Sequence, residues 1–188
     1  MLNHSMIFDD FFKDPMRIKA LINMEPMRDE KYVDGVTYPN ITRLPQSVHQ
    51  ELHDNLTTIF GPQLQEVLSF ARYSFKGVTP PHWAHSDREI AQFLGLIYLS
   101  EAPEDGTAVV RHKELNFETH PHDELRKDIL LAHANKRDEW EVTFMCPARF
   151  NRLFILNAEL VHAAMAEYGS TKEDGRLVIS TFFNVVTA

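Results

Sequence analysis

The sequence has little of several features that mark particular classes of protein. Its 188 residues include one cysteine, Cys146, so an internal disulfide and a cysteine-rich zinc site are both excluded. This fits a reducing compartment, and we expect a cytoplasmic location. No run approaches the roughly 20 apolar residues of a membrane span. Asp9 and Asp10 also interrupt the segment where a signal peptide needs its apolar core, so we expect no association with a membrane.

Basic residues are also scarce. The chain has 19 Lys and Arg against 27 Asp and Glu, a net charge of −8. Proteins that bind duplex nucleic acid usually carry a basic face, so the charge disfavours a nucleic acid as partner. We find no repeat, low-complexity segment or linker, which predicts a single domain over residues 1–188. No pattern in the sequence indicates an oligomeric state.

The first third of the chain is predicted to be partly helical, with Met6 to Phe8 as a short strand candidate. Asp14-Pro15 is a typical helix start, with Asp as the N-cap and Pro at the first helical position. Apolar residues at spacings of three and four predict a second helix over residues 46–60, which Gly61-Pro62 ends. We expect a third short helix over 62–70. Residues 1–69 are therefore interpreted as a helical support region.

From residue 70 onward the pattern is that of strands. Short apolar, β-branched or alternating runs are separated by turns, at 93–99, 107–111, 140–145, 153–156, 160–165 and 177–186. This predicts a mainly β fold with flanking α, a sandwich or jelly roll rather than a parallel α/β sheet. The charged segment 112–139 interrupts it as an insertion. It is interpreted either as a functional flap or as a solvated surface excursion.

Three side chains form a candidate metal site. His85 and Asp87 are two residues apart, so in a strand both project to the same side. His162 lies among small and apolar residues, where an idle imidazole would be costly to bury. Two His and one carboxylate make the facial triad that binds non-haem Fe(II) and leaves other positions open. A chance His-x-Asp pair and a hydrogen-bonded core His are the plainer interpretations of the same residues.

Arg176 opens the last apolar run, where a guanidinium needs a buried anion. Its planar fork suits a carboxylate of a ligand. The alternative is a structural ion pair with an acid such as Glu167 or Asp174.

The order His85-x-Asp87, His162, Arg176 resembles the Fe(II)/2-oxoglutarate-dependent dioxygenase superfamily, most closely its prolyl-hydroxylase-like branch. Shorter motifs add to the resemblance, so that it covers most of the chain. They are Phe8-Asp9-Asp10-Phe11-Phe12, Arg72-Tyr73-Ser74-Phe75, Asp105-Gly106-Thr107 and Asn151-Arg152-Leu153-Phe154.

The resemblance implies a double-stranded β-helix (jelly roll, cupin-like) with N-terminal helices. It also implies Fe(II), with 2-oxoglutarate as cosubstrate and dioxygen as oxidant. The expected product is a hydroxylated amino acid, peptidyl side chain or small metabolite. Asp87 favours hydroxylation, because halogenating relatives typically replace this carboxylate with a small residue. The implied metal ligands are His85, Asp87 and His162, and the implied cosubstrate-binding residues are Arg176 and Tyr73, with Arg152 or Arg149 as alternative anchors.

Two other functions fit the same residues. One is a cupin-type metal enzyme that does not use 2-oxoglutarate, and the other is a non-catalytic ligand-binding barrel. Trp83 is interpreted as core filler or as part of a pocket wall. The insertion is a candidate lid over the substrate because it is rich in His and charge, with His120, His122, Arg126, His133, Lys136 and Arg137.

Overall fold

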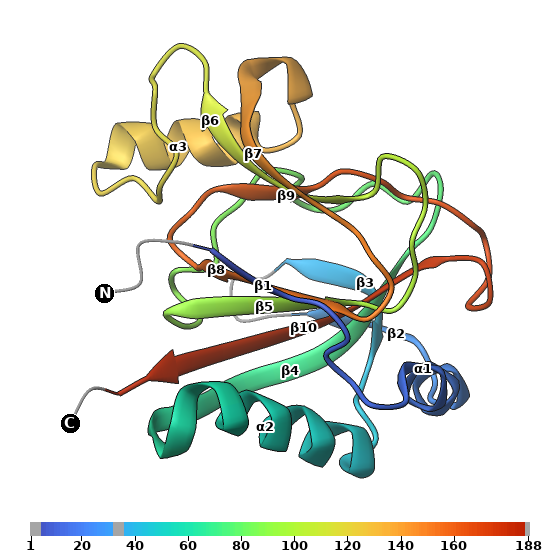
Figure 1. Ribbon diagram of the computed structural model, residues 1–188. Helices are drawn as coiled ribbons and strands as arrows, with labels where there is room; N and C mark the ends of the chain where they lie inside the picture. The colour runs from blue at the N-terminus through green and yellow to red at the C-terminus, as the bar shows by residue number, and fades with distance from the viewer. Residues whose placement is uncertain (1–4, 32–35, 187–188) are drawn as a thin grey trace.

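Two β-sheets face each other in the computed structural model, which describes residues 5–31 and 36–186 (Figure 1). The large sheet has seven strands in the order β1-β8-β5-β10-β4-β3-β2, and the small sheet has three in the order β7-β6-β9. The large sheet consists of β1 (Met6–Phe8), β2 (Arg28–Lys31), β3 (Thr37–Thr42), β4 (Leu64–Ser74), β5 (Phe93–Tyr98), β8 (Arg152–Asn157) and β10 (Arg176–Val185). The small sheet consists of β6 (Gly106–His112), β7 (Trp140–Pro147) and β9 (His162–Ala164). The predicted mainly β fold with flanking helices is confirmed.

Strand pairing places the last strand, β10, beside strands from much earlier in the chain. β10 lies between β4 and β5, and β6 lies between β7 and β9, with every pair antiparallel. An isolated antiparallel bridge between His85 and His162 adds the segment around His85 to the edge of the small sheet. A core fills the space between the sheets, and it includes Leu94, Tyr98, Phe154, Val178 and Phe182.

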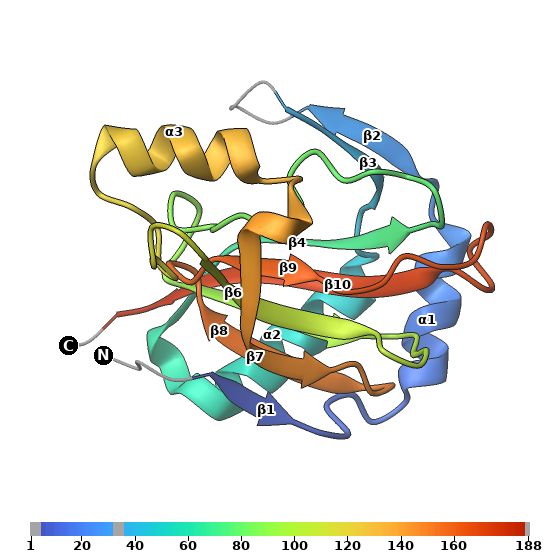
Figure 2. The same cartoon turned by 90° about the horizontal axis from the view of Figure 1, so that it is seen from above.

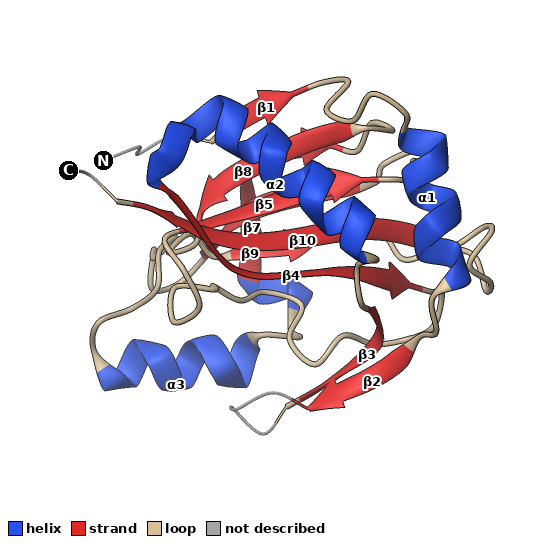
Figure 3. Ribbon diagram, turned by 90° about the horizontal axis from the view of Figure 1, so that it is seen from below, coloured by secondary structure: helices blue, strands red, loops and turns tan. Residues whose placement is uncertain are grey.

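Two helices cover the outer face of the large sheet, as Figure 3 shows from below. They are α1 (Pro15–Met24) and α2 (Gln46–Phe60), and both were predicted. Asp14 caps α1 by accepting a hydrogen bond from the Arg17 backbone N–H, and Pro15 takes the first position. The buried helix residues are Ile18, Ile22, Val48, Leu52 and Leu56, and they pack against Ile97, Leu177, Ile179 and Phe183 of the sheet. Among the described helices, none is long and apolar enough to cross a membrane.

The prediction of a third helix over residues 62–70 is wrong. A short 3-10 helix (Gly61–Gln63) leads directly into β4, which pairs with β10 along its whole length. Residues 1–69 also contribute β1, β2 and β3, so this part of the chain supplies strands as well as helices.

The insertion packs on the outside of the small sheet (Figures 1 and 2). Its helix α3 (Glu124–His133) is capped by Asp123 and buries Leu130. Leu130 belongs to a cluster with Trp83, Ala84, Ala108, Val110, Phe117, Trp140, Val161 and Ala163. Trp83 therefore belongs to a hydrophobic core, and it also lines a cavity together with His85. The insertion has an apolar inner face instead of being solvated all round.

Candidate metal centre

The three predicted metal ligands meet at one edge of the small sheet. His85 and His162 are bridge partners, with His85 N–H donating to His162 O at 3.1 Å and His162 N–H donating to His85 O at 2.8 Å. The Asp87 N–H donates to Ala158 O at 2.9 Å, which continues the extended backbone. Because side chains alternate along such a segment, His85 and Asp87 share one side and face His162.

The ligand atoms lie at the separations that one ion needs. His162 Nε2 is 3.2 Å from Asp87 Oδ2, and His85 Nε2 is 3.9 Å from the same oxygen. The two imidazole centroids are 4.6 Å apart. Metal bonds of about 2.1 Å place neighbouring ligand atoms roughly 3 to 3.5 Å apart, so small side-chain movements would let all three coordinate a single cation.

Backbone carbonyls fix both imidazoles. His162 Nδ1 lies 2.9 Å from Leu160 O, and His85 Nδ1 lies 3.3 Å from Trp83 O. A carbonyl only accepts hydrogen bonds, so each Nδ1 carries the hydrogen and donates it. Nε2 is then the nitrogen that faces Asp87 on each ring. This is the usual outer-shell arrangement of metal-binding histidines.

The electrostatics of the three groups favour a cation. Burial lowers the pKa of His85 to about 4, although Asp87 partly opposes this. Burial raises the pKa of Asp87, but His85 and His162 outweigh it, and the net pKa lies below the ordinary value for an aspartate. Burial lowers the pKa of His162, but its hydrogen bond and attraction to Asp87 outweigh that and raise the pKa overall. An ionised carboxylate thus faces a neutral imidazole at His85 and, at His162, an imidazole whose positively charged form it stabilises.

A cavity of about 40 Å³ adjoins the site. Its wall includes Arg72, Ser74, His85, Ala164 and Glu167. A volume of this size holds water molecules only. An organic ligand therefore requires side chains of the wall to move.

The hydroxyl of Tyr73 already has a hydrogen-bond partner. Although it contributes to the cavity wall, its hydroxyl donates to Asn23 Oδ1, and its ring packs in the core beneath the helices. The neighbouring Arg72 is the cation that acts on His85 from this strand, and it lowers the pKa of that imidazole slightly. The cosubstrate-binding role of Tyr73 stays a prediction, and Arg72 is a second residue of this motif that lines the cavity.

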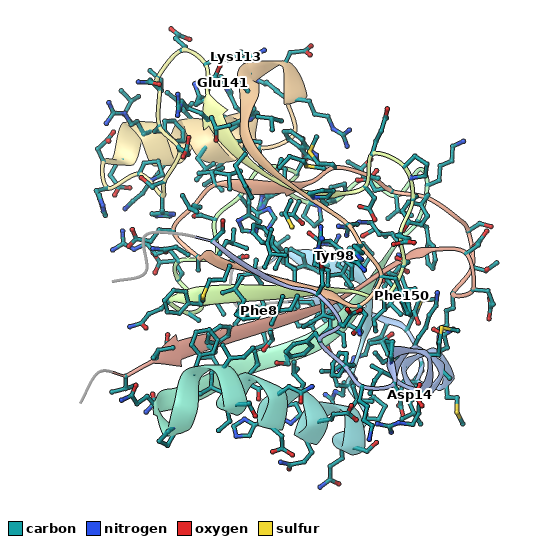
Figure 4. The ribbon with its side chains drawn as sticks, in the orientation of Figure 1. Phe8, Asp14, Tyr98, Lys113, Glu141 and Phe150 are labelled. Atoms are coloured by element: carbon teal, nitrogen blue, oxygen red, sulfur yellow. The ribbon has the colours of Figure 1, made fainter. Side chains whose placement is uncertain are left out.

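Arg176 is buried and already has an anion beside it. Its Nε donates to Asp105 Oδ1 at 2.7 Å, and its Nη2 donates to Gly106 O at 3.3 Å. The guanidinium carbon lies 5.8 Å from the ring centroid of Tyr98, which lies between the two sheets (Figure 4). The partner is thus Asp105, and neither Glu167 nor Asp174, the acids that the sequence suggested.

The alternative anchors lie on the outside of the molecule. Arg152 Nε is 2.7 Å from Asp9 Oδ1, and Arg149 Nη1 is 2.8 Å from Asp9 Oδ2. Both arginines therefore fasten the segment after β1 to the start of β8. Both guanidinium groups are thus paired with Asp9 in this structure.

A second group of potential ligands, His112, His133 and Glu139, lies under the insertion. His112 Nδ1 accepts a hydrogen bond from the Leu115 N–H at 3.2 Å, so its hydrogen is on Nε2, which faces His133 Nδ1 at 3.0 Å. The ring centroids are 5.2 Å apart, which means that the two nitrogens lie almost on the line between the rings. Such a pair is a linear hydrogen bond and leaves no position for an ion between the imidazoles.

Solved structures with a similar fold cover nearly the whole chain. The non-heme alpha-ketoglutarate-dependent epimerase SnoN from nogalamycin biosynthesis aligns with a TM-score of 0.58 at 12% identity, over 95% of this chain and 78% of that one. A 2OG-Fe(II) oxygenase family oxidoreductase from Burkholderia pseudomallei aligns with a TM-score of 0.58 at 13% identity, over 95% and 84%. HygX from Streptomyces hygroscopicus, with nickel and 2-oxoglutarate bound, aligns with a TM-score of 0.58 at 13% identity, over 94% and 81%.

These likenesses, at such low identity, establish a common fold, that of the Fe(II)/2-oxoglutarate-dependent oxygenases. No curated protein matches the sequence. Residues 2–183 match the model of a family of unknown function, DUF6445. The chain therefore belongs to the DUF6445 family, a family of unknown function whose fold in this member is that of the 2-oxoglutarate oxygenases.

Proposed function

We propose that this chain is a non-haem Fe(II)- and 2-oxoglutarate-dependent dioxygenase of the hydroxylase type. The observation that carries the proposal is the meeting of His85, Asp87 and His162 within 4.8 Å of one another in an oxygenase fold. Related folds support the choice of cofactors, since SnoN was solved with Fe3+ and alpha-ketoglutarate and HygX with iron. The proposal includes a jelly-roll arrangement of the strands and a place in the prolyl-hydroxylase-like branch of the superfamily.

The donor set fits Fe(II). Two imidazole nitrogens and one carboxylate oxygen on one side of an ion leave its other positions for ligands. When bound, iron supplies the coupling of dioxygen reduction to oxidative decarboxylation of 2-oxoglutarate. In the overall reaction a substrate C–H, dioxygen and 2-oxoglutarate give an alcohol, succinate and carbon dioxide. The role of the chain is to hold the ligands, orient the substrate and keep water out.

Arg176 is our proposed anchor for the far carboxylate of 2-oxoglutarate. It contacts Gly106, while His162 is the register partner of Val109 on the same strand. Three residues of a strand span roughly 10 Å, which an arginine side chain and a five-carbon diacid can bridge together. A guanidinium has five N–H groups, and its contacts with Asp105 and Gly106 use two of them.

Arg72 is a second cation for an anionic ligand, because it lines the cavity beside His85. Since that cavity is small, cosubstrate binding requires flexible wall side chains such as Arg72 and Glu167 to shift. We propose an amino acid, a peptidyl side chain or a small metabolite as the substrate, in a cytoplasmic setting. The net charge of −8 argues against nucleic acid.

An anaerobic titration with Fe(II) and 2-oxoglutarate tests the function. The wild type is expected to develop the visible charge-transfer band of the chelate, His162→Ala to lose it, and Arg176→Ala to require at least tenfold more 2-oxoglutarate. His53→Ala, on the outer helix α2, is the matched histidine control and should behave like wild type.

A wild type that binds iron but gives no band with 2-oxoglutarate, and no succinate in air, would favour the cupin-type enzyme without 2-oxoglutarate. A wild type that binds no iron, or a band that persists in His162→Ala, would refute the proposed centre.

A further inference from the structure

The segment that carries His85 and Asp87 is held from both sides. On one side His85 and Asp87 bond to the backbone of His162 and Ala158. On the other side its partner is the end of the insertion, just after α3. The Ala84 N–H donates to Ala134 O at 2.8 Å. This part of the insertion therefore takes the place of a neighbouring strand.

Asn135 closes the arrangement with its side chain. Its Oδ1 accepts from the Trp83 N–H at 2.8 Å, and its Nδ2 donates to Pro81 O at 2.8 Å. Arg137 adds a third contact, with its guanidinium 5.1 Å from the Trp83 ring centroid and 3.7 Å from Glu167. The contacts with Pro81, Trp83 and Ala84 all fall on residues that precede His85.

These contacts reach the metal ligand through one peptide group. The peptide between Trp83 and Ala84 donates its N–H to Ala134 O, and its carbonyl faces His85 Nδ1 at 3.3 Å. The preceding peptide is held by Asn135. The insertion thus fixes the carbonyl that sets the tautomer and the direction of the His85 ring. A contact that served only to cover the core would not need to hold this carbonyl.

We propose that Asn135 is a positioning residue for the metal centre and that the insertion holds the ligand segment in place. This inference rests on the proposed function. Loss of the Asn135 amide frees Pro81 O and the Trp83 N–H to bond with water. The Trp83–Ala84 peptide is then held by Ala134 alone, so the Trp83 carbonyl and the His85 imidazole are less firmly oriented. Metal affinity then falls while the core of the domain stays intact, because the Asn135 side chain is exposed.

Anaerobic Mn²⁺ titration, followed by the electron paramagnetic resonance signal of the free ion, tests the inference without any turnover. Loss of an outer-shell partner typically weakens metal affinity 10- to 100-fold. Asn135→Ala should raise the Kd for Mn²⁺ about tenfold. Asn135→Asp should give an intermediate Kd, because it keeps the acceptor for Trp83 and loses the donor to Pro81. Lys136→Ala, an exposed neighbour in the same turn, is the matched control and should bind as wild type does.

The apo proteins are compared by thermal unfolding, and their Tm values are expected to agree. Wild-type affinity in Asn135→Ala would overturn the inference, as would an equal loss in Lys136→Ala. If Asn135→Ala unfolds at a lower temperature, the Mn²⁺ affinity of Asn135→Asp is the deciding measurement. Wild-type affinity in Asn135→Asp would also refute the positioning role of Asn135. A wild type that binds no Mn²⁺ would instead refute the proposed metal centre, and the inference with it.

Discussion

The buried ion pair between Arg176 and Asp105 can be tested by removing one charge at a time. The Arg176 side chain is 6% exposed and the Asp105 side chain 0%. Removing one partner of such a pair costs about 3–5 kcal/mol, because the other charge stays buried without compensation. In a domain of this size, 1 kcal/mol shifts the Tm by roughly 2–4 °C. Asp105→Asn, which keeps the shape, should therefore lower the Tm by roughly 6–20 °C.

A double-mutant cycle isolates the interaction from other effects. Asp105→Asn, Arg176→Met and the double variant are compared by urea unfolding, followed by circular dichroism. We expect the double variant to lose clearly less stability than the sum of the two single variants, since it leaves no unpaired charge. Single costs below about 1 kcal/mol, or additivity within about 0.5 kcal/mol, would refute the argument from burial.

Two further predictions concern the ion pair at Asp9 and two glycines. The hydrogen bond from Arg152 lowers the pKa of Asp9, so their contribution to stability is present above the ordinary aspartate pKa and is lost as the pH falls through the lowered one. In urea unfolding, Asp9→Asn should be less stable than wild type at pH 7. A difference in stability that does not shrink as the pH falls below the ordinary aspartate pKa would contradict this. Gly106→Ala places a Cβ 2.2 Å from Cys146 O and should lower the free energy of unfolding by more than about 2 kcal/mol in the same assay. The control is Gly77→Ala, whose Cβ meets nothing within 4 Å and which should lower it by about 1 kcal/mol.

The grouping of His85, Asp87 and His162 could be predicted because each residue carries a local signal and their order along the chain matches a known pattern. His85 and Asp87 share a side through strand alternation, and His162 stands out as an imidazole in an apolar run. The face of the strand that holds Tyr73 could not be predicted. Both sides of that strand are covered, so Arg72 and Tyr73 each point into the protein and no polar–apolar alternation marks the cavity side.

Long-range pairing explains the other differences. Leu64 and Leu68 are spaced as on a helix, but hydrogen bonds from β10, more than 100 residues later, draw this segment into the sheet. The partner of Arg176 was missed for the same reason, since Asp105 is 71 residues away and several acids are nearer in sequence. Short-range patterns located α1 and α2 correctly because their caps and apolar faces are contained within each helix.

The bridge between His85 and His162 joins positions that are 77 residues apart in the chain. An ion shared by these two side chains would bind the folded chain and find no such site in the unfolded one, so its binding free energy would add to the stability of the fold. Opening of the edge of the small sheet then requires the ion to leave first. Proteolysis and amide hydrogen exchange in residues 80–87 and 158–164 should therefore slow together on metal addition, because a single event controls both segments.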